Sequence, residues 1–198
     1  LFEAKEFSFE TLSGRLRELA FLNPGLKITV EDERSGKKHE FLFKDGIREF
    51  VAYLNKSRQT LFDPPIKLHQ EMATENGEAS VDIALQWNDG YDEKVFAFAN
   101  NIHNHEGGTH LIGFKAALTR TINAYGQKNS LFKDLKDELP SGDDMREGLA
   151  AVISMRLPGA SFEGQTKTKL SNTEAKSIVE TMVNDRLGAW LEENPSLA

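Results

Sequence analysis

The stretch Ala79-Ser80-Val81-Asp82-Ile83-Ala84-Leu85-Gln86-Trp87 is the clearest guide to the fold class, because apolar and polar residues alternate with the two-residue period of a β-strand. The large apolar residues of 81–87 share one face of this strand. Residues 66–73 form a similar strand, and the dipeptide Asn76-Gly77 between the two favours a tight hairpin. Residues 95–102 are nearly all apolar and predict a third strand, so we expect a sheet in this part of the chain.

Further elements surround these strands. Residues 148–157 predict another strand, and 26–31 with 39–43 predict a separate hairpin. Apolar residues spaced three and four apart predict helices over 8–23, over a short segment with Asp45 as its N-cap, over 111–125 and over about 172–193. The first helix would bury Leu12, Leu16, Leu19 and Ala20, and Ser171 with Glu174 would form a capping box before the last. The result is an α+β chain with helices packed on one mixed or antiparallel sheet.

Composition excludes several classes of protein. The 198 residues include 24 Lys and Arg against 31 Asp and Glu, a net charge of −7, and no cysteine. The chain is therefore neither a disulfide-linked scaffold nor, with no apolar run near the roughly 20 residues that a membrane helix needs, a membrane protein. Its acidity argues against a module that lives on nucleic acid. Because it opens Leu1-Phe2-Glu3 without Met or a signal-like stretch, we expect a piece of a longer cytoplasmic polypeptide.

Residues 103–110 gather three histidines and a carboxylate. His103, His105 and His110, with Glu106, contain donors that zinc binds, but no recognised metal-site spacing, and a strand-to-helix junction explains them equally well. Gly107-Gly108 would allow a tight turn and leave N–H groups at the helix start for an anion, or for a cap supplied by Thr109. We favour the capped turn and expect no metal.

Two polar segments remain as candidates for chemistry. Asp143, Asp144 and Glu147 could act as general acids or bind magnesium, although capping of a short helix is the simpler interpretation. Residues 164–170 (Gly-Gln-Thr-Lys-Thr-Lys-Leu) lack the spacing of a phosphate-binding loop. They could still deliver one ammonium, and an amide from Gln165, to a phosphate bound elsewhere, but composition alone favours a solvated basic loop. No Ser/His/Asp or Cys/His arrangement is evident.

Five motifs of this chain resemble the DNA gyrase B family, and more narrowly the second, transducer domain of the ATPase subunit of bacterial type IIA topoisomerases. The two most distinctive are Glu106-Gly107-Gly108-Thr109-His110 and Phe162-Glu163-Gly164-Gln165-Thr166-Lys167-Thr168-Lys169-Leu170. Residues 16–23, 84–90 and 144–149 support them. The motifs are spread over nearly the whole chain in the family order, which makes the resemblance more specific than any single motif would be.

The resemblance implies a fold similar to the second domain of ribosomal protein S5, with a left-handed β-α-β crossover, in a single transducer domain spanning 1–198. It also implies that the segment relays ATP hydrolysis to DNA strand passage and negative supercoiling. In this family ATP and magnesium are bound mainly by the preceding N-terminal ATPase domain. The implied partners are that domain, the gyrase A protein, DNA and a second copy of the gyrase B protein, with no membrane partner.

Residue roles follow from the same resemblance. Lys167 matches the lysine that reaches the γ-phosphate of ATP, and Gln165 matches its neighbouring polar contact. Lys115 falls where the family places a basic residue facing the DNA cavity, and the helix of about 172–193 leads to the next domain. The isolated segment is expected not to hydrolyse ATP. The alternatives are the same segment from the ATPase subunit of topoisomerase IV, or a non-enzymatic S5-like nucleic-acid-binding module.

Overall fold

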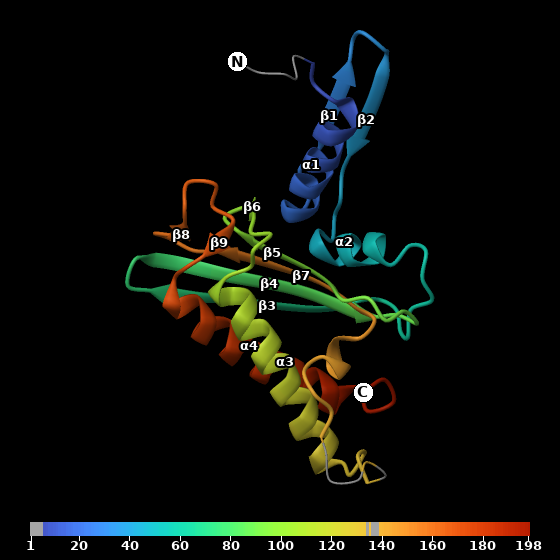
Figure 1. Ribbon diagram of the computed structural model, residues 1–198, viewed down its shortest axis with the longest axis vertical. Coiled ribbons are helices and arrows are strands. Elements are labelled where there is room, and N and C mark those ends of the chain that lie inside the picture. Colours follow the sequence, from blue (N-terminus) through green and yellow to red (C-terminus); the bar gives the residue numbers. More distant parts are fainter. Residues whose placement is uncertain (1–5, 134, 136–138) are drawn as a thin grey trace.

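A five-stranded sheet lies at the centre of the computed structural model, which describes residues 6–133, 135 and 139–198 (Figure 1). Its strand order is β3-β4-β7-β5-β6, and every pair is antiparallel except β5 with β7. The strands are β3 (Ile66–Thr74), β4 (Gly77–Trp87), β5 (Lys94–Ala99), β6 (Ile102–His103) and β7 (Leu149–Arg156). The sheet is therefore mixed, and the predicted hairpin at Asn76-Gly77 is confirmed as the β3–β4 connection.

One connection between neighbouring strands is parallel. Strand β5 pairs with β7, and helix α3 (Thr109–Lys128) lies between them in chain order. A parallel pair requires such a crossover, because a tight turn can join only antiparallel neighbours. The β-α-β unit is thus present, and its left-handedness stays a prediction.

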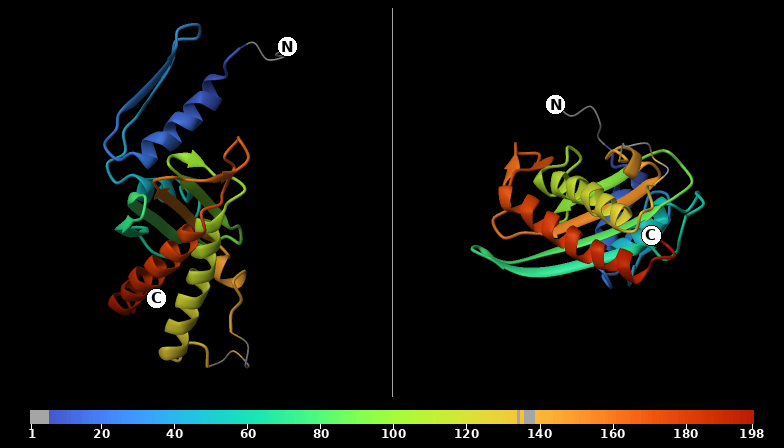
Figure 2. Two further views of the ribbon diagram at one scale, coloured as in Figure 1. Left: turned by 90° about the vertical axis from the view of Figure 1, so that its left-hand side faces the viewer. Right: turned by 90° about the horizontal axis from the view of Figure 1, so that it is seen from below.

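Helices cover both faces of the sheet (Figure 2). Helices α3 and α4 (Thr173–Glu193) pack on one face, and α2 (Ile47–Leu54) with the end of α1 (Phe9–Leu22) packs on the other. Strand β7 lies between the two layers, and its residues from Leu149 to Met155 are all buried. This explains why 148–157 reads as a continuous apolar run rather than an alternating one.

The first helix and a two-stranded hairpin extend away from the sheet (Figure 1). The hairpin consists of β1 (Ile28–Asp32) and β2 (Lys37–Phe41), and it packs against α1. In α1 the buried side chains include Phe9, Ser13 and Phe21, whereas Leu12 is 42% exposed, so the predicted apolar face was only partly right. The single domain over 1–198 stays a prediction.

The predicted strand over 95–102 was wrong in one respect, because the chain reverses inside it. Asn100 and Asn101 form a two-residue loop between β5 and β6, with φ of 50° and 63°. Such a loop needs a positive φ at both positions, and asparagine tolerates this conformation better than other residues with a Cβ. Two consecutive asparagines were the signal for this reversal.

Three predicted helix caps were also wrong. Gly46, Gly108 and Asn172 occupy the N-cap positions of α2, α3 and α4, and none makes a side-chain capping bond. The Asp45 carboxylate instead accepts a hydrogen bond of 2.8 Å from Lys67 Nζ. Asn172 Nδ2 donates to Glu174, which replaces the expected bond between Ser171 and Glu174. Ion pairing across the fold competes with local capping, and spacing alone cannot show which one forms.

Candidate functional site

Residues 164–168, here called the lysine loop, connect two short strands at one end of the molecule. Strands β8 (Phe162–Glu163) and β9 (Lys169–Leu170) pair with each other, and β9 is followed directly by α4. Gln165 and Lys167 are both exposed on this loop, so the structure brings the two predicted phosphate contacts onto one accessible turn.

Lys167 has an unusual backbone and an available charge. Its φ of 56° lies in the left-handed region, which a residue with a Cβ adopts only where its surroundings impose it. Its ammonium lies 5.7 Å from the centre of the Phe162 ring, and it forms no ion pair with any residue that the structure describes. By contrast, Lys169 Nζ lies 3.1 Å from a Glu163 carboxylate oxygen. Of the two lysines, Lys167 is the one whose charge can meet an external anion.

The lysine loop is fastened to residues 104–108, here called the anchor segment, which lie between β6 and α3. Four hydrogen bonds join the two: Asn104 Nδ2 to Lys167 O (2.8 Å), Glu106 N to Thr168 O (3.0 Å), Thr168 Oγ1 to Glu106 Oε2 (3.0 Å) and Leu170 N to Gly107 O (3.1 Å). The two most distinctive sequence motifs are therefore parts of one structure. The loop is held at its apex and along the strand that leaves it.

The glycine pair of the anchor segment serves a close backbone approach. Gly108 has a φ of 137° and forms a parallel bridge with Leu170, and a Cβ on Gly108 would fall 2.5 Å from the Leu170 backbone nitrogen. Thr109 does not cap the helix, because its hydroxyl oxygen is buried without a hydrogen-bond partner among the described residues. The expected capped turn is thus replaced by a contact with the lysine loop.

The three histidines do not converge on a metal site. The rings of His103 and His105 are 5.7 Å apart, but His110 is fully buried in the first turn of α3, with neither ring nitrogen bonded to a described residue. Burial lowers the pKa of His110 to about 4, and burial is also the main cause that lowers the pKa of His103. No group of three or more potential metal ligands occurs within residues 6–133, 135 and 139–198.

The acidic cluster has the structural role that capping predicted. Asp144 begins a short 3-10 helix, η1 (Asp144–Arg146), and its carboxylate accepts hydrogen bonds of 2.7 Å from both the backbone nitrogen and the hydroxyl of Ser141. These bonds lower the pKa of Asp144 below its usual value. Asp143 pairs with Arg146. The Asp143 and Asp144 carboxylates are thus engaged in local bonds.

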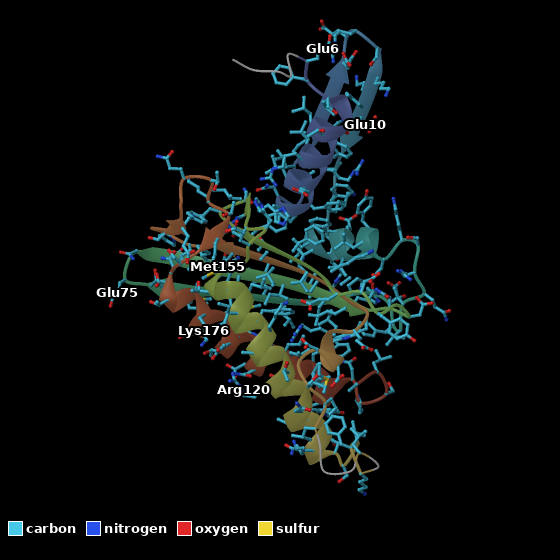
Figure 3. All side chains as sticks on the ribbon, in the orientation of Figure 1. Glu6, Glu10, Glu75, Arg120, Met155 and Lys176 are labelled. Atoms are coloured by element: carbon cyan, nitrogen blue, oxygen red, sulfur yellow. The ribbon has the colours of Figure 1, made fainter. Side chains whose placement is uncertain are left out.

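Lys115 lies in α3, where it forms an ion pair with Glu93. Glu93 also binds Arg146, at 3.0 Å. Burial alone would raise the pKa of Glu93, but hydrogen bonds and charge from Lys115 and Arg146 outweigh it and hold this pKa below its usual value. Arg120 projects from the same helix (Figure 3), where it lies 3.8 Å from Glu180 of α4. Neither cation of α3 is free of a carboxylate.

Sequence reasoning missed a buried amide network at residues 84–90. Asn55 Nδ2 donates to Gln86 Oε1 (2.8 Å), Asn88 Nδ2 donates to Asn55 Oδ1 (2.9 Å), and Gln86 Nε2 donates to Phe62 O (2.6 Å). All three amide side chains are buried. The network ties the end of α2 to β4, so this motif supports the sheet rather than a ligand. A polar Gln86 between apolar strand residues was the signal.

The fold has clear counterparts among solved structures. The 43K ATPase domain of Thermus thermophilus gyrase B, in complex with an aminocoumarin, is 37% identical and superposes with a TM-score of 0.83 over 99% of this chain and 51% of that one. The topoisomerase IV ATP-binding domain of Francisella tularensis, in complex with a small-molecule inhibitor, is 28% identical with a TM-score of 0.77 over the same shares. The fold is thus that of the ATPase region of type II topoisomerases.

The sequence comparison is more specific. Residues 46–198 match the family model of DNA gyrase B, and the chain therefore belongs to the DNA gyrase B family. The DNA gyrase B protein of Myxococcus xanthus is 63% identical over 196 residues, which cover 99% of this chain and 23% of that protein. The chain thus spans about a quarter of this relative. In the part of the chain that the structure describes, no helix is long and apolar enough to cross a membrane.

Proposed function

We propose that this chain is the transducer segment of an ATP-dependent type II DNA topoisomerase, a DNA gyrase B protein, and that it contributes Lys167 to the γ-phosphate of ATP. The observation that carries the proposal is the exposed Lys167 ammonium, unpaired among the described residues and held on a loop bonded at several points. Family membership supports it, because the matched gyrase B structure is named as an ATPase domain.

The chemistry needs only a positioned charge from this segment. Phosphoryl transfer places negative charge on the γ-phosphate oxygens, and an ammonium fixed beside them stabilises the transition state. The exposed amide of Gln165 can donate a hydrogen bond to the same group. We infer that ATP and Mg²⁺ are bound mainly by a preceding N-terminal domain of a longer protein, because the chain matches only part of its relatives. The isolated segment is then inactive.

The connections of the lysine loop suggest how a phosphate signal would leave it. Leu170 at the end of β9 is three residues from the first residue of α4, and the anchor segment runs directly into α3. The two helices pack so closely that a Cβ on Gly113 of α3 would fall 2.5 Å from the Lys176 carbonyl oxygen of α4. Loss of the γ-phosphate would therefore act on a helix pair that moves as a unit.

The wider assignments belong to the same proposal. The full-length gyrase B protein would work in the cytoplasm with the gyrase A protein, with a second copy of itself and with DNA, and would couple hydrolysis to strand passage and negative supercoiling. Lys115 would face the passing DNA and contact phosphates only, a weak interaction that salt suppresses. Its ion pair with Glu93 means that this charge is partly compensated in the free protein.

Nucleotide binding to the full-length protein tests the role of Lys167. We expect Lys167→Ala to weaken binding of a non-hydrolysable ATP analogue on the order of tenfold while ADP affinity stays unchanged, because only the triphosphate presents the lost contact. Lys169→Ala is the matched control, since Lys169 already pairs with Glu163. Equal effects of Lys167→Ala on both nucleotides would contradict a γ-phosphate contact.

A further inference from the structure

Lys167 holds its left-handed backbone through a contact with a distant side chain. The Asn104 side-chain amide donates a hydrogen bond of 2.8 Å to the Lys167 carbonyl oxygen. Asn104 is only 2% exposed, whereas the Lys167 side chain is exposed. A buried, fixed donor therefore grips the backbone of the residue whose side chain must reach outward.

The local chain does little to impose this conformation. Within the loop, Lys167 N donates to Gly164 O at 3.4 Å, a long bond beside that from Asn104. A left-handed φ of 56° is unfavourable for any residue with a Cβ, and it persists only where other contacts over-determine it. Without the Asn104 donor, the Lys167 peptide would be free to relax toward commoner conformations, and its ammonium would change direction.

We propose that Asn104 is a positioning residue for Lys167: its buried amide fixes the lysine backbone so that the ammonium points toward the γ-phosphate. This inference rests on the proposed function of Lys167. It adds a residue outside the lysine loop, in the anchor segment at the start of α3, to the group that sets the geometry of phosphate contact.

The other half of the Asn104 amide shows that folding alone does not explain this residue. Asn104 Oδ1 is buried and has no hydrogen-bond partner among the described residues. A buried unsatisfied oxygen is unfavourable, and an apolar side chain of the same shape would avoid it. Leucine is close to asparagine in shape and lacks the donor. Asn104→Leu should therefore keep or raise stability while it releases the Lys167 carbonyl.

Asn123 offers a matched control within the same protein. Its Nδ2 also donates to a backbone carbonyl, that of Pro140 at 3.1 Å, and its Oδ1 is also buried without a partner among the described residues. It lies in α3, away from the lysine loop. Asn123→Leu thus removes the same kind of bond and the same unsatisfied atom without touching Lys167.

ATP turnover by the full-length protein, with its thermal unfolding, is the test. We expect Asn104→Leu to lower kcat about tenfold, with KM for ATP nearly unchanged and unfolding at an equal or higher temperature, while Asn123→Leu leaves kcat unaltered. In the Lys167→Ala background, Asn104→Leu should cause no further loss, because a positioning residue has nothing left to position. Asn104→Ala, which needs no additional space, repeats the test if the leucine variant unfolds.

Each outcome decides one claim. Wild-type turnover in Asn104→Leu, an equal further loss in the Lys167→Ala background, or unfolding of both Asn104 variants would overturn the positioning role. These results leave the Lys167 proposal standing if Lys167→Ala by itself lowers turnover. If Lys167→Ala has no effect on turnover, the proposed function fails first, and the inference about Asn104 fails with it.

Discussion

Gly108 and Leu170 pair as a parallel backbone bridge, although one begins α3 and the other ends the strand that leaves the lysine loop. The contact leaves no room for a side chain on Gly108. It brings the Gly-Gly motif and the lysine motif into one structural unit, so a sequence change in either motif acts on both. The position of Lys167 thus depends on residues far from it in the chain.

The first prediction concerns this bridge. Gly108→Ala should destabilise the chain by about 3 kcal/mol, because alanine strains a φ of 137° and its Cβ meets the Leu170 backbone. Denaturant unfolding measures the loss. Gly14→Ala is the control: no atom lies within 4 Å of the new Cβ, and alanine in the interior of α1 should stabilise by about 0.5–1 kcal/mol. A small change at Gly108 would contradict the close approach.

The buried His110 predicts a pH dependence of stability. Burial lowers its folded-state pKa from 6.5 to about 4, so the unfolded chain takes up a proton below pH 6.5 that the folded chain refuses until about pH 4. Stability is therefore lost as pH falls through this window, by up to about 3 kcal/mol. Unfolding from pH 7 to about pH 4.5 should show a shallower loss in His110→Gln than in the wild type. Parallel profiles would show that His110 titrates normally.

A third prediction concerns the ion pair at Lys115. Glu93→Gln removes the carboxylate that Lys115 contacts, so duplex DNA should bind the chain more tightly, and log K should fall more steeply with log salt, by about 0.9 per released phosphate contact. Fluorescence anisotropy between about 50 and 200 mM salt gives this slope. Adding Lys115→Ala should abolish the gain. An unchanged slope in Glu93→Gln would argue against a DNA contact by Lys115.

Periodicity predicted much of the fold, because the sheet and helices bury regular patterns. The β3–β4 hairpin, β7, α3 and α4 all follow apolar spacing in the sequence. Turn and cap chemistry was less predictable. Asp45 was expected to cap α2 but pairs with Lys67, which lies on β3. Such choices depend on which residues the tertiary structure brings together, and single-sequence patterns do not contain that information.

The candidate site was predictable in part. The resemblance indicated Gln165 and Lys167, and the structure places both on one exposed loop. The role of the anchor segment was not predictable, because hydrogen bonds such as that from Asn104 to Lys167 join residues far apart in sequence. No local pattern marks Asn104 as a donor to a distant carbonyl. Its neighbours His103 and His105 drew attention to metal binding instead.

ATP turnover by the full-length protein tests the central claim most directly, with wild type compared to Lys167→Ala and Lys169→Ala. Removal of a charge that acts in the transition state should lower turnover roughly 10²–10³-fold while nucleotide still binds, and Lys169→Ala should stay near the wild type. Unchanged turnover in Lys167→Ala would contradict the account: the lysine loop would then be a solvated turn, and this segment a mechanical connection whose phosphate contact lies elsewhere.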